Sequence, residues 1–226
     1  TSAVVGDLTL SGNYNSNIIL IGDSKNSSVL GNIVGSNSSG LTVTLNAIEC
    51  TVGNISTSAT GTTGNAGAVS LTGDFIAGNI TTTVTNGSNT TGLGGAVTLN
   101  GIGGNALCGN VLTTGSTSGA SGNCTVSNGW TISGTLMASG GLSGNSGTIS
   151  VTDSIVTGTI TASHNGTTGS PSFTINRSRT GVITLTKNGT GTWGSIAVTN
   201  SVILSTITIT ANNGTSFPTT SFKNSN

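Results

Sequence analysis

A short phrase recurs along the whole chain and restricts its fold more than any other feature. It is a glycine, one variable residue and then a branched aliphatic residue, and the successive spacings are 25, 22, 25, 31, 25, 24, 23 and 24 residues. A period of this size is typical of repeat architectures, in which each unit buries its apolar face against its neighbours. The anchoring residues are Gly6, Gly31, Gly53, Gly78, Gly109, Gly134, Gly158, Gly181 and, in the ninth place, Ser205.

The aliphatic residues two positions after these anchors are all Leu, Ile or Val. We expect them to point inward and to form one continuous core ladder, because residues at equivalent positions of stacked coils lie above one another. The nine residues are Leu8, Ile33, Ile55, Ile80, Val111, Leu136, Ile160, Ile183 and Ile207.

Each anchor is followed by a second phrase, such as "LTVTL" at 41 or "AVTLN" at 96, which alternates apolar and polar residues. Such alternation indicates strands, and the density of Gly and β-branched residues disfavours helices. A third short strand precedes many anchors ("SVL", "FIA", "SIV"). We therefore predict an all-β fold, a single-stranded parallel β-helix (β-solenoid) of about nine coils with about 24 residues per coil, stacked about 4.8 Å apart.

The domain organisation follows from the extent of the repeat. We expect one solenoid domain over residues 1–210 and a C-terminal tail over 211–226, which could contact a neighbouring subunit. The variable loops 83–95 and 113–123 should project from one corner of the solenoid.

The residue directly after the anchor is Asn in four consecutive coils: Asn32, Asn54, Asn79 and Asn110. Stacked amides can bond one another and the turn backbone, which would make an asparagine ladder. The alternative is that Asn occurs here only because it favours turns.

Repeats of the form "GNI…GGAVTL" resemble those of filamentous-haemagglutinin-type bacterial surface proteins and other β-helix adhesins. The resemblance covers most of the chain, as a style of repeat. It implies a right-handed β-helix at a cell surface.

Reactive groups are sparse, and charged residues make up only 4% of the chain. Asp74 and Asp153 would lie three coils apart, or about 14 Å, which is too far for the carboxylate pair of a glycosidase. The other acidic residues form no convincing pair. We expect no enzymatic activity, no cofactor and no metal site.

Single residues of interest each have a structural and a functional interpretation. His164, in "ASHNGTTG", is expected to be a solvated loop residue. Trp130 and Trp193 are expected to cap corners of the core, with sugar stacking as the alternative. Arg179 interrupts an apolar column and would either turn outward, toward a glycan or a neighbouring subunit, or mark a register shift. The other members of that column are Val4, Val29, Ile76, Leu107, Ile132 and Val156.

The three cysteines have no metal-binding spacing. Cys108 and Cys124 could form a disulfide, which would fit an oxidising location. Cys50 would then be either a buried small residue or a cross-link between chains.

Five basic residues and a net charge of zero argue against nucleic acid as a partner, and no apolar stretch is long enough to span a membrane as a helix. Hydroxyl and amide groups replace charge as solubilising groups, which favours an extracellular or cell-surface location. Secretion would then require a signal segment absent from this chain.

The ends of a β-solenoid expose unpaired strand edges, and we recognise no capping segment in the sequence. We predict assembly ends formed by Val4, Val5, Ile207, Ile209, Phe217 and Phe222, covered by copies of the same chain. The rival interpretation is a fragment of a longer adhesin.

The first functional hypothesis is therefore a structural subunit of an extracellular filament or surface fibre. The alternatives are an adhesin or virus-fibre segment that binds surface glycans through its loops, and an ice-binding protein, which would need an unbroken two-column Thr array. A polysaccharide-active enzyme ranks last.

Overall fold

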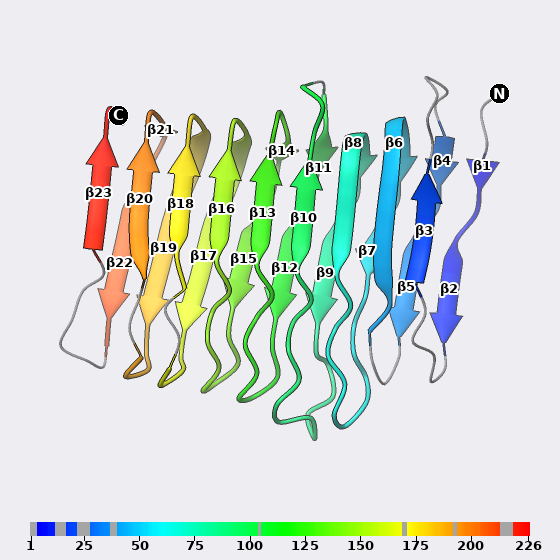
Figure 1. Cartoon of the computed structure of the whole chain (residues 1–226), viewed down its shortest axis with the longest axis horizontal. Coiled ribbons are helices and arrows are strands. Elements are labelled where there is room, and N and C mark those ends of the chain that lie inside the picture. The colour runs from blue at the N-terminus through cyan, green and yellow to red at the C-terminus, as the bar shows by residue number, and fades with distance from the viewer. Residues whose placement is uncertain are drawn as a thin grey trace.

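The computed structural model describes residues 4–11, 17–21, 28–36, 40–103, 105–168, 171–191, 194–212 and 219–226. The described residues form 23 strands and no helix, and every strand pairing is parallel. The strands stack along one axis into a rod, with the two termini at opposite ends (Figure 1). The predicted parallel β-solenoid is thereby confirmed.

Three ladders of strands run the length of the rod, and each has nine rungs in the described residues. Ladder A follows the glycine anchors and consists of β2 (Leu8–Ser11), β5 (Ile33–Ser36), β7 (Ile55–Ser56), β9 (Ile80–Thr83), β12 (Val111–Thr114), β15 (Leu136–Ser139), the second half of β17 (Ile155–His164), the second half of β19 (Arg179–Lys187) and β22 (Ile207–Ala211).

Ladder B follows the alternating second phrase and faces the viewer in Figure 1. It consists of β3 (Asn17–Ile21), the first half of β6 (Thr42–Val52), the first half of β8 (Val69–Ala77), β10 (Val97–Asn100), β13 (Cys124–Ser127), β16 (Ile149–Thr152), β18 (Phe173–Asn176), β20 (Ser195–Thr199) and β23 (Thr219–Lys223).

Ladder C is the short third strand, with two or three paired residues per coil. It consists of β1 (Val4–Val5), β4 (Ser28–Leu30), the second halves of β6 and β8, β11 (Leu107–Cys108), β14 (Thr131–Ile132), the first halves of β17 and β19, and β21 (Val202–Ile203).

The core lies between the three ladders and is made by strict alternation. In β16, for example, Ile149 and Val151 are buried while Ser150 and Thr152 are partly exposed. Because side chains of a strand alternate between its two faces, every second residue joins the core. Buried residues of all three ladders form one continuous hydrophobic cluster from Ile33 to Val198.

The corner between ladders B and C is a sharp turn that repeats along the rod. Asn128, Asp153, Arg177 and Asn200 have positive φ angles between 45° and 60° at this corner. Gly73 takes the same place in β8 with φ 120°, and a β-carbon there would collide with the carbonyl oxygen of Ala47 in the coil beneath. Only glycine fits that position.

The long irregular segments that follow ladder A lie along one edge of the rod, as expected for the loops within 83–95 and 113–123 (Figure 1). The C-terminal boundary differs from the prediction. Residues 219–226 are not a separate tail, because β23 pairs with β20 over five residues and forms the last rung of ladder B. No helix within the described ranges is long and apolar enough to cross a membrane.

Candidate functional site

The nine aliphatic residues of the predicted core ladder lie in one column of ladder A. Each is paired with the next: Leu8 with Ile33, Ile33 with Ile55, Ile55 with Ile80, and so on to Ile183 with Ile207. The coil that separates Ile80 from Val111 is longer, yet the register is kept. The extra residues are therefore accommodated outside the strands, in the loop between β9 and β10 and in the corner between β10 and β11.

The four predicted asparagines form a hydrogen-bonded ladder along the corner before ladder A. The backbone N–H and the side-chain Nδ2 of each asparagine donate to Oδ1 of the residue one coil below, at 2.7–3.2 Å. Asp7 begins the series as an acceptor for Asn32, and Thr135 N–H ends it by donating to Asn110 Oδ1 at 2.8 Å. A carboxylate suits the first place because that position only needs to accept.

Two further ladders were not anticipated from the sequence. Asn212 Nδ2 donates to Asn188 Oδ1 (2.6 Å), and Asn188 Nδ2 donates to Asn165 Oδ1 (2.7 Å), at the loop edge after ladder A. These asparagines are 23 and 24 residues apart in the sequence, which is the spacing of one coil and could have predicted the ladder.

The second unexpected series is a serine ladder inside the B–C corner. The Oγ of Ser178 accepts from Ser154 N–H (3.2 Å), and the Oγ of Ser201 accepts from Ser178 N–H (3.1 Å). Ser178 and Ser201 also donate to the carbonyl oxygen two residues earlier, at 2.7 and 2.8 Å. These buried hydroxyls satisfy backbone groups that the sharp turn would otherwise leave unpaired.

The terminal rungs expose side chains whose counterparts in inner rungs are buried. Leu8 is 36% exposed, against 0% for Ile80 in the same column, and Phe222 is 50% exposed, against 0% for its partner Val198. Ile207 and Ile209 are half-buried against the core. Val4 and Val5 form β1, but the structure describes only their backbone. Phe217 lies outside the described residues.

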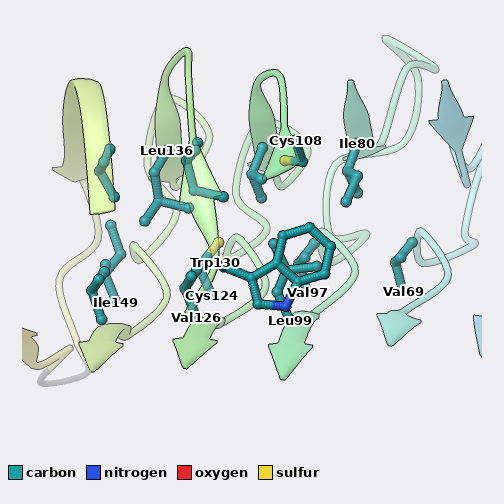
Figure 2. Close-up of a cluster of buried hydrophobic side chains, with 14 of the residues drawn as sticks. Val69, Ile80, Val97, Leu99, Cys108, Cys124, Val126, Trp130, Leu136 and Ile149 are labelled. Carbon is teal, nitrogen blue, oxygen red and sulfur yellow. The ribbon is translucent and has the colours of Figure 1, made fainter. Parts of the chain in front are cut away.

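The proposed disulfide between Cys108 and Cys124 is absent. Cys50, Cys108 and Cys124 are all free and buried. Cys108 belongs to ladder C, near Ile80 and Leu136, whereas Cys124 lies in ladder B beside Val126 (Figure 2). Burial raises the pKa of Cys50, and raises the pKa of Cys108 and of Cys124 to about 12, so these thiols are unreactive core residues.

Trp130 is a core residue, as expected. Its ring is fully buried and stacks on Phe75, with centroids 6.4 Å apart and an interplanar angle of 11°. Trp130 lies among the core side chains drawn in Figure 2, so its ring is not accessible to a sugar. Trp193 lies outside the described residues.

His164 is not a solvated loop residue, which corrects the prediction. It is the last residue of β17, is fully buried, and accepts a hydrogen bond at Nδ1 from Ser146 N–H at 3.4 Å. Lys187, its register partner in β19, is also buried. Burial, together with the positive charge of Lys187, lowers the pKa of His164.

Arg179 does point outward, but it does not break an inward column. Its register partners Ile155 and Val202 are themselves exposed, as are Val29, Ile76 and Leu107 further along the ladder. Ile132 and Val156, which the sequence pattern placed in this column, belong to the adjacent inward one. A shift of one residue reverses the face on which a strand residue lies.

Five charged residues lie near the B–C corner: Glu49, Asp74, Asp153, Arg177 and Arg179. Arg177 binds Asp153 of the preceding coil through two hydrogen bonds of 2.6 and 2.7 Å, and this pairing lowers the pKa of Asp153. Glu49 and Asp74, which come from neighbouring coils, line one hollow of about 240 Å³ together with Asn105. Glu49 and Asp74 each precede the anchor glycine of their coil by four residues. This equal spacing was the sequence signal that the two acids lie together.

No group of three or more His, Cys, Asp or Glu side chains in the described part of the chain could hold a metal ion. Comparison with protein-family models, curated proteins and solved structures finds no match. The proposals below therefore depend on the chain's own geometry.

Proposed function

We propose that the protein is a structural subunit of an extracellular filament or surface fibre, in which rods stack end to end. The observation that carries this proposal is the exposure of core-column residues at both ends of the rod. Leu8 at one end and Phe222 at the other occupy columns that are fully buried in the inner rungs.

Stacking would bury these side chains by extending the same ladders. Among the described residues, β2 pairs only with β5 and β22 only with β19, so each presents an open edge. Unpaired strand edges are templates for another strand. A contact between the last rung of one copy and the first rung of the next is head-to-tail and does not close, so it produces a filament.

The extracellular location is part of the same proposal and rests on composition. Only 4% of residues are charged, and the outward columns of ladder B carry hydroxyls and amides, such as Thr98, Asn100, Thr125 and Ser127. A rod with this surface is suited to a mechanical role, in which shape and durability matter more than reactive groups.

The test is electron microscopy of the purified chain at increasing concentration, beside two variants. Phe222→Lys places a charge in the last rung and should shorten or abolish filaments. Leu142→Lys is the matched control, because Leu142 is 85% exposed on a loop away from both ends, and it should polymerise as the wild type does. Single rods of unchanged length at every concentration would contradict the proposal.

Glycan binding by an adhesin is the second candidate, and one observation favours it. The loop edge contains a hollow of about 340 Å³ lined by Thr85, Asn86, Asn89, Ser116 and Thr117, among other residues. Hydroxyls and amides of this kind can bond sugar hydroxyls. A glycan array that retains the wild type but not Asn86→Ala would support it.

Ice binding has weaker support. The outward column of ladder A that contains Thr81 and Thr161 also contains Leu112 and Met137, so it is not an unbroken row of Thr. Ice binding would show as thermal hysteresis in solution.

A further inference from the structure

One lateral face of the rod carries an apolar stripe that the end-to-end contact would leave uncovered. It is formed by the outward residues of ladder C, which follow one another in register, and we call it the outer stripe. Its members from the second rung to the ninth are Val29, Thr51, Ile76, Leu107, Thr131, Ile155, Arg179 and Val202.

The outer stripe concentrates apolar surface. Of the eleven large hydrophobic side chains that are exposed in the described part of the chain, five belong to it, with exposed fractions of 38–55%. Ile76, for example, lies between buried Phe75 and Ala77, and Ile155 lies between buried Ser154 and Val156. Eight rungs at about 4.8 Å give a stripe roughly 34 Å long. Single exposed aliphatic residues need no explanation, but an aligned row of this length indicates an interaction surface.

Charge is distributed unevenly along this face. Glu49 lies beside Thr51, and Asp74 lies beside Ile76, both in the N-terminal half of the stripe. Arg179 lies in the C-terminal half. In the described part of the chain Arg177 is bound to Asp153, whereas Glu49, Asp74 and Arg179 have no ion-pair partner.

We propose that a second copy of the chain docks on the outer stripe in antiparallel orientation, about a two-fold axis that passes between the rungs of Leu107 and Thr131. Ile76 then faces Ile155 of the partner subunit, and Leu107 faces Thr131 of the partner subunit. Thr51, with Glu49 beside it, faces Arg179 of the partner subunit, and the exchange is repeated on the other side of the axis.

Charge complementarity selects this orientation. A parallel pair would place Arg179 next to Arg179 of the partner subunit and would bring the acidic residues together, which is unfavourable. The antiparallel pair is isologous and closes on itself, so it yields dimers and not sheets of rods. The stripe is one residue wide, so we expect a small interface and a dimer that dissociates on dilution.

The dimer goes beyond the proposed filament and can be separated from it by experiment. Phe222→Lys blocks end-to-end stacking, so sedimentation of this variant measures lateral pairing alone. In that background Arg179→Glu should weaken dimerisation at least tenfold, and Glu49→Arg combined with Arg179→Glu should restore it. Leu142→Glu, on a loop remote from the stripe, should leave it unchanged.

Cross-linking tests the orientation directly. The double variant Ile76→Cys, Ile155→Cys should be joined into dimers by a bis-maleimide of about 10 Å span, which matches the spacing of packed sheets. Either single variant should stay uncoupled, because like residues would lie about 14 Å apart along the axis. The native thiols are buried, and the wild type treated with the same reagent is the control for Cys50, which lines the hollow beside Ile76.

Each outcome is informative. Dimers from the Ile76→Cys single variant would indicate a parallel pair and overturn the proposal. Monomers at all concentrations, or a dimer unaffected by Arg179→Glu, would also overturn it and leave the stripe to a different kind of molecule.

Discussion

Asn79 illustrates how a single turn residue acquires a defined role through stacking. Its Oδ1 accepts two hydrogen bonds from Asn110, and its Nδ2 donates to Asn54. In an isolated turn, Asn would be favoured only because it tolerates the turn backbone. In the stacked molecule the same side chain joins three coils.

Replacing Asn79 with Ala should lower the free energy of unfolding by about 1–2 kcal/mol, because three hydrogen bonds at a solvent-accessible corner are lost. Asn46→Ala is the matched control, since Asn46 is exposed on ladder B and its side chain makes no hydrogen bond among the described residues. Urea unfolding measures both. Equal effects would show that the ladder adds no stability beyond the turn itself.

His164 gives the molecule a stability that depends on pH. In the unfolded chain its pKa should be near 6.5, whereas in the folded chain burial and Lys187 lower that pKa. As the pH falls below about 6.5, the unfolded state therefore binds more protons than the folded state, and the free energy of unfolding decreases.

The slope should reach at most about 1.4 kcal/mol per pH unit between pH 6.5 and the folded-state pKa. Urea unfolding from pH 7.5 to 5 should show this decline in the wild type and a flatter profile in His164→Gln. Asp153→Asn is the control: because Arg177 lowers the pKa of Asp153, this carboxyl titrates only below the range in which His164 titrates. Its replacement should therefore change the stability by the same amount at every pH from 7.5 to 5 and leave the slope unaltered. An identical decline in His164→Gln would exclude this role.

At the scale of strands, position along the rod decides the contribution of equivalent residues. Leu136 in β15 and Leu8 in β2 belong to the same column, but Leu136 is fully buried between two rungs and Leu8 is partly exposed on the first. The cavity left by a truncated side chain costs more where both neighbouring rungs are in place.

Leu136→Ala should therefore destabilise the protein by about 2–5 kcal/mol, and Leu8→Ala should cost no more than about half of that. Thermal unfolding of the two variants measures the difference, and a low protein concentration keeps the rods from stacking during the measurement. A cost for Leu8→Ala equal to that of Leu136→Ala would imply that the first rung is already covered.

The strands also show where sequence patterns lose information. Ladders A and B alternate regularly from the anchor glycine, so their inward residues could be assigned from the sequence. Ladder C follows a turn with positive φ at positions such as Asp153 and Arg177, and its strands are only two or three residues long. With so short a pattern, the sequence places Ile132 and Val156 one position away from their true column, and the outward apolar residues are assigned to the core.

For the whole molecule, each rung contacts only its neighbours, so stability is distributed along the axis. The inner rungs are covered on both sides, whereas β22 and β23 are paired on one side only within the described residues. Opening should therefore begin at the ends.

Hydrogen exchange should show this gradient, with amides of β12 and β16 protected at least tenfold more than those of β22 and β23 in dilute protein. At concentrations that give filaments, protection of β22 and β23 should rise toward that of the inner strands. Equal protection of the inner and the terminal strands in dilute protein would contradict the view that each rung is stabilised only by its neighbours.

The sequence alone determined the period, the parallel solenoid, the nine-residue core ladder and the position of the asparagine ladder. In-register stacking converts a repeat along the chain directly into a column in space, so these features need only the spacing. The tertiary structure alone decided the serine ladder, the burial of His164 and Lys187, the free state of the cysteines, the shared hollow of Glu49 and Asp74, and the outward direction of the outer stripe. Those features depend on how each corner turns and on which face a short strand presents, and a change of one residue in either reverses the result.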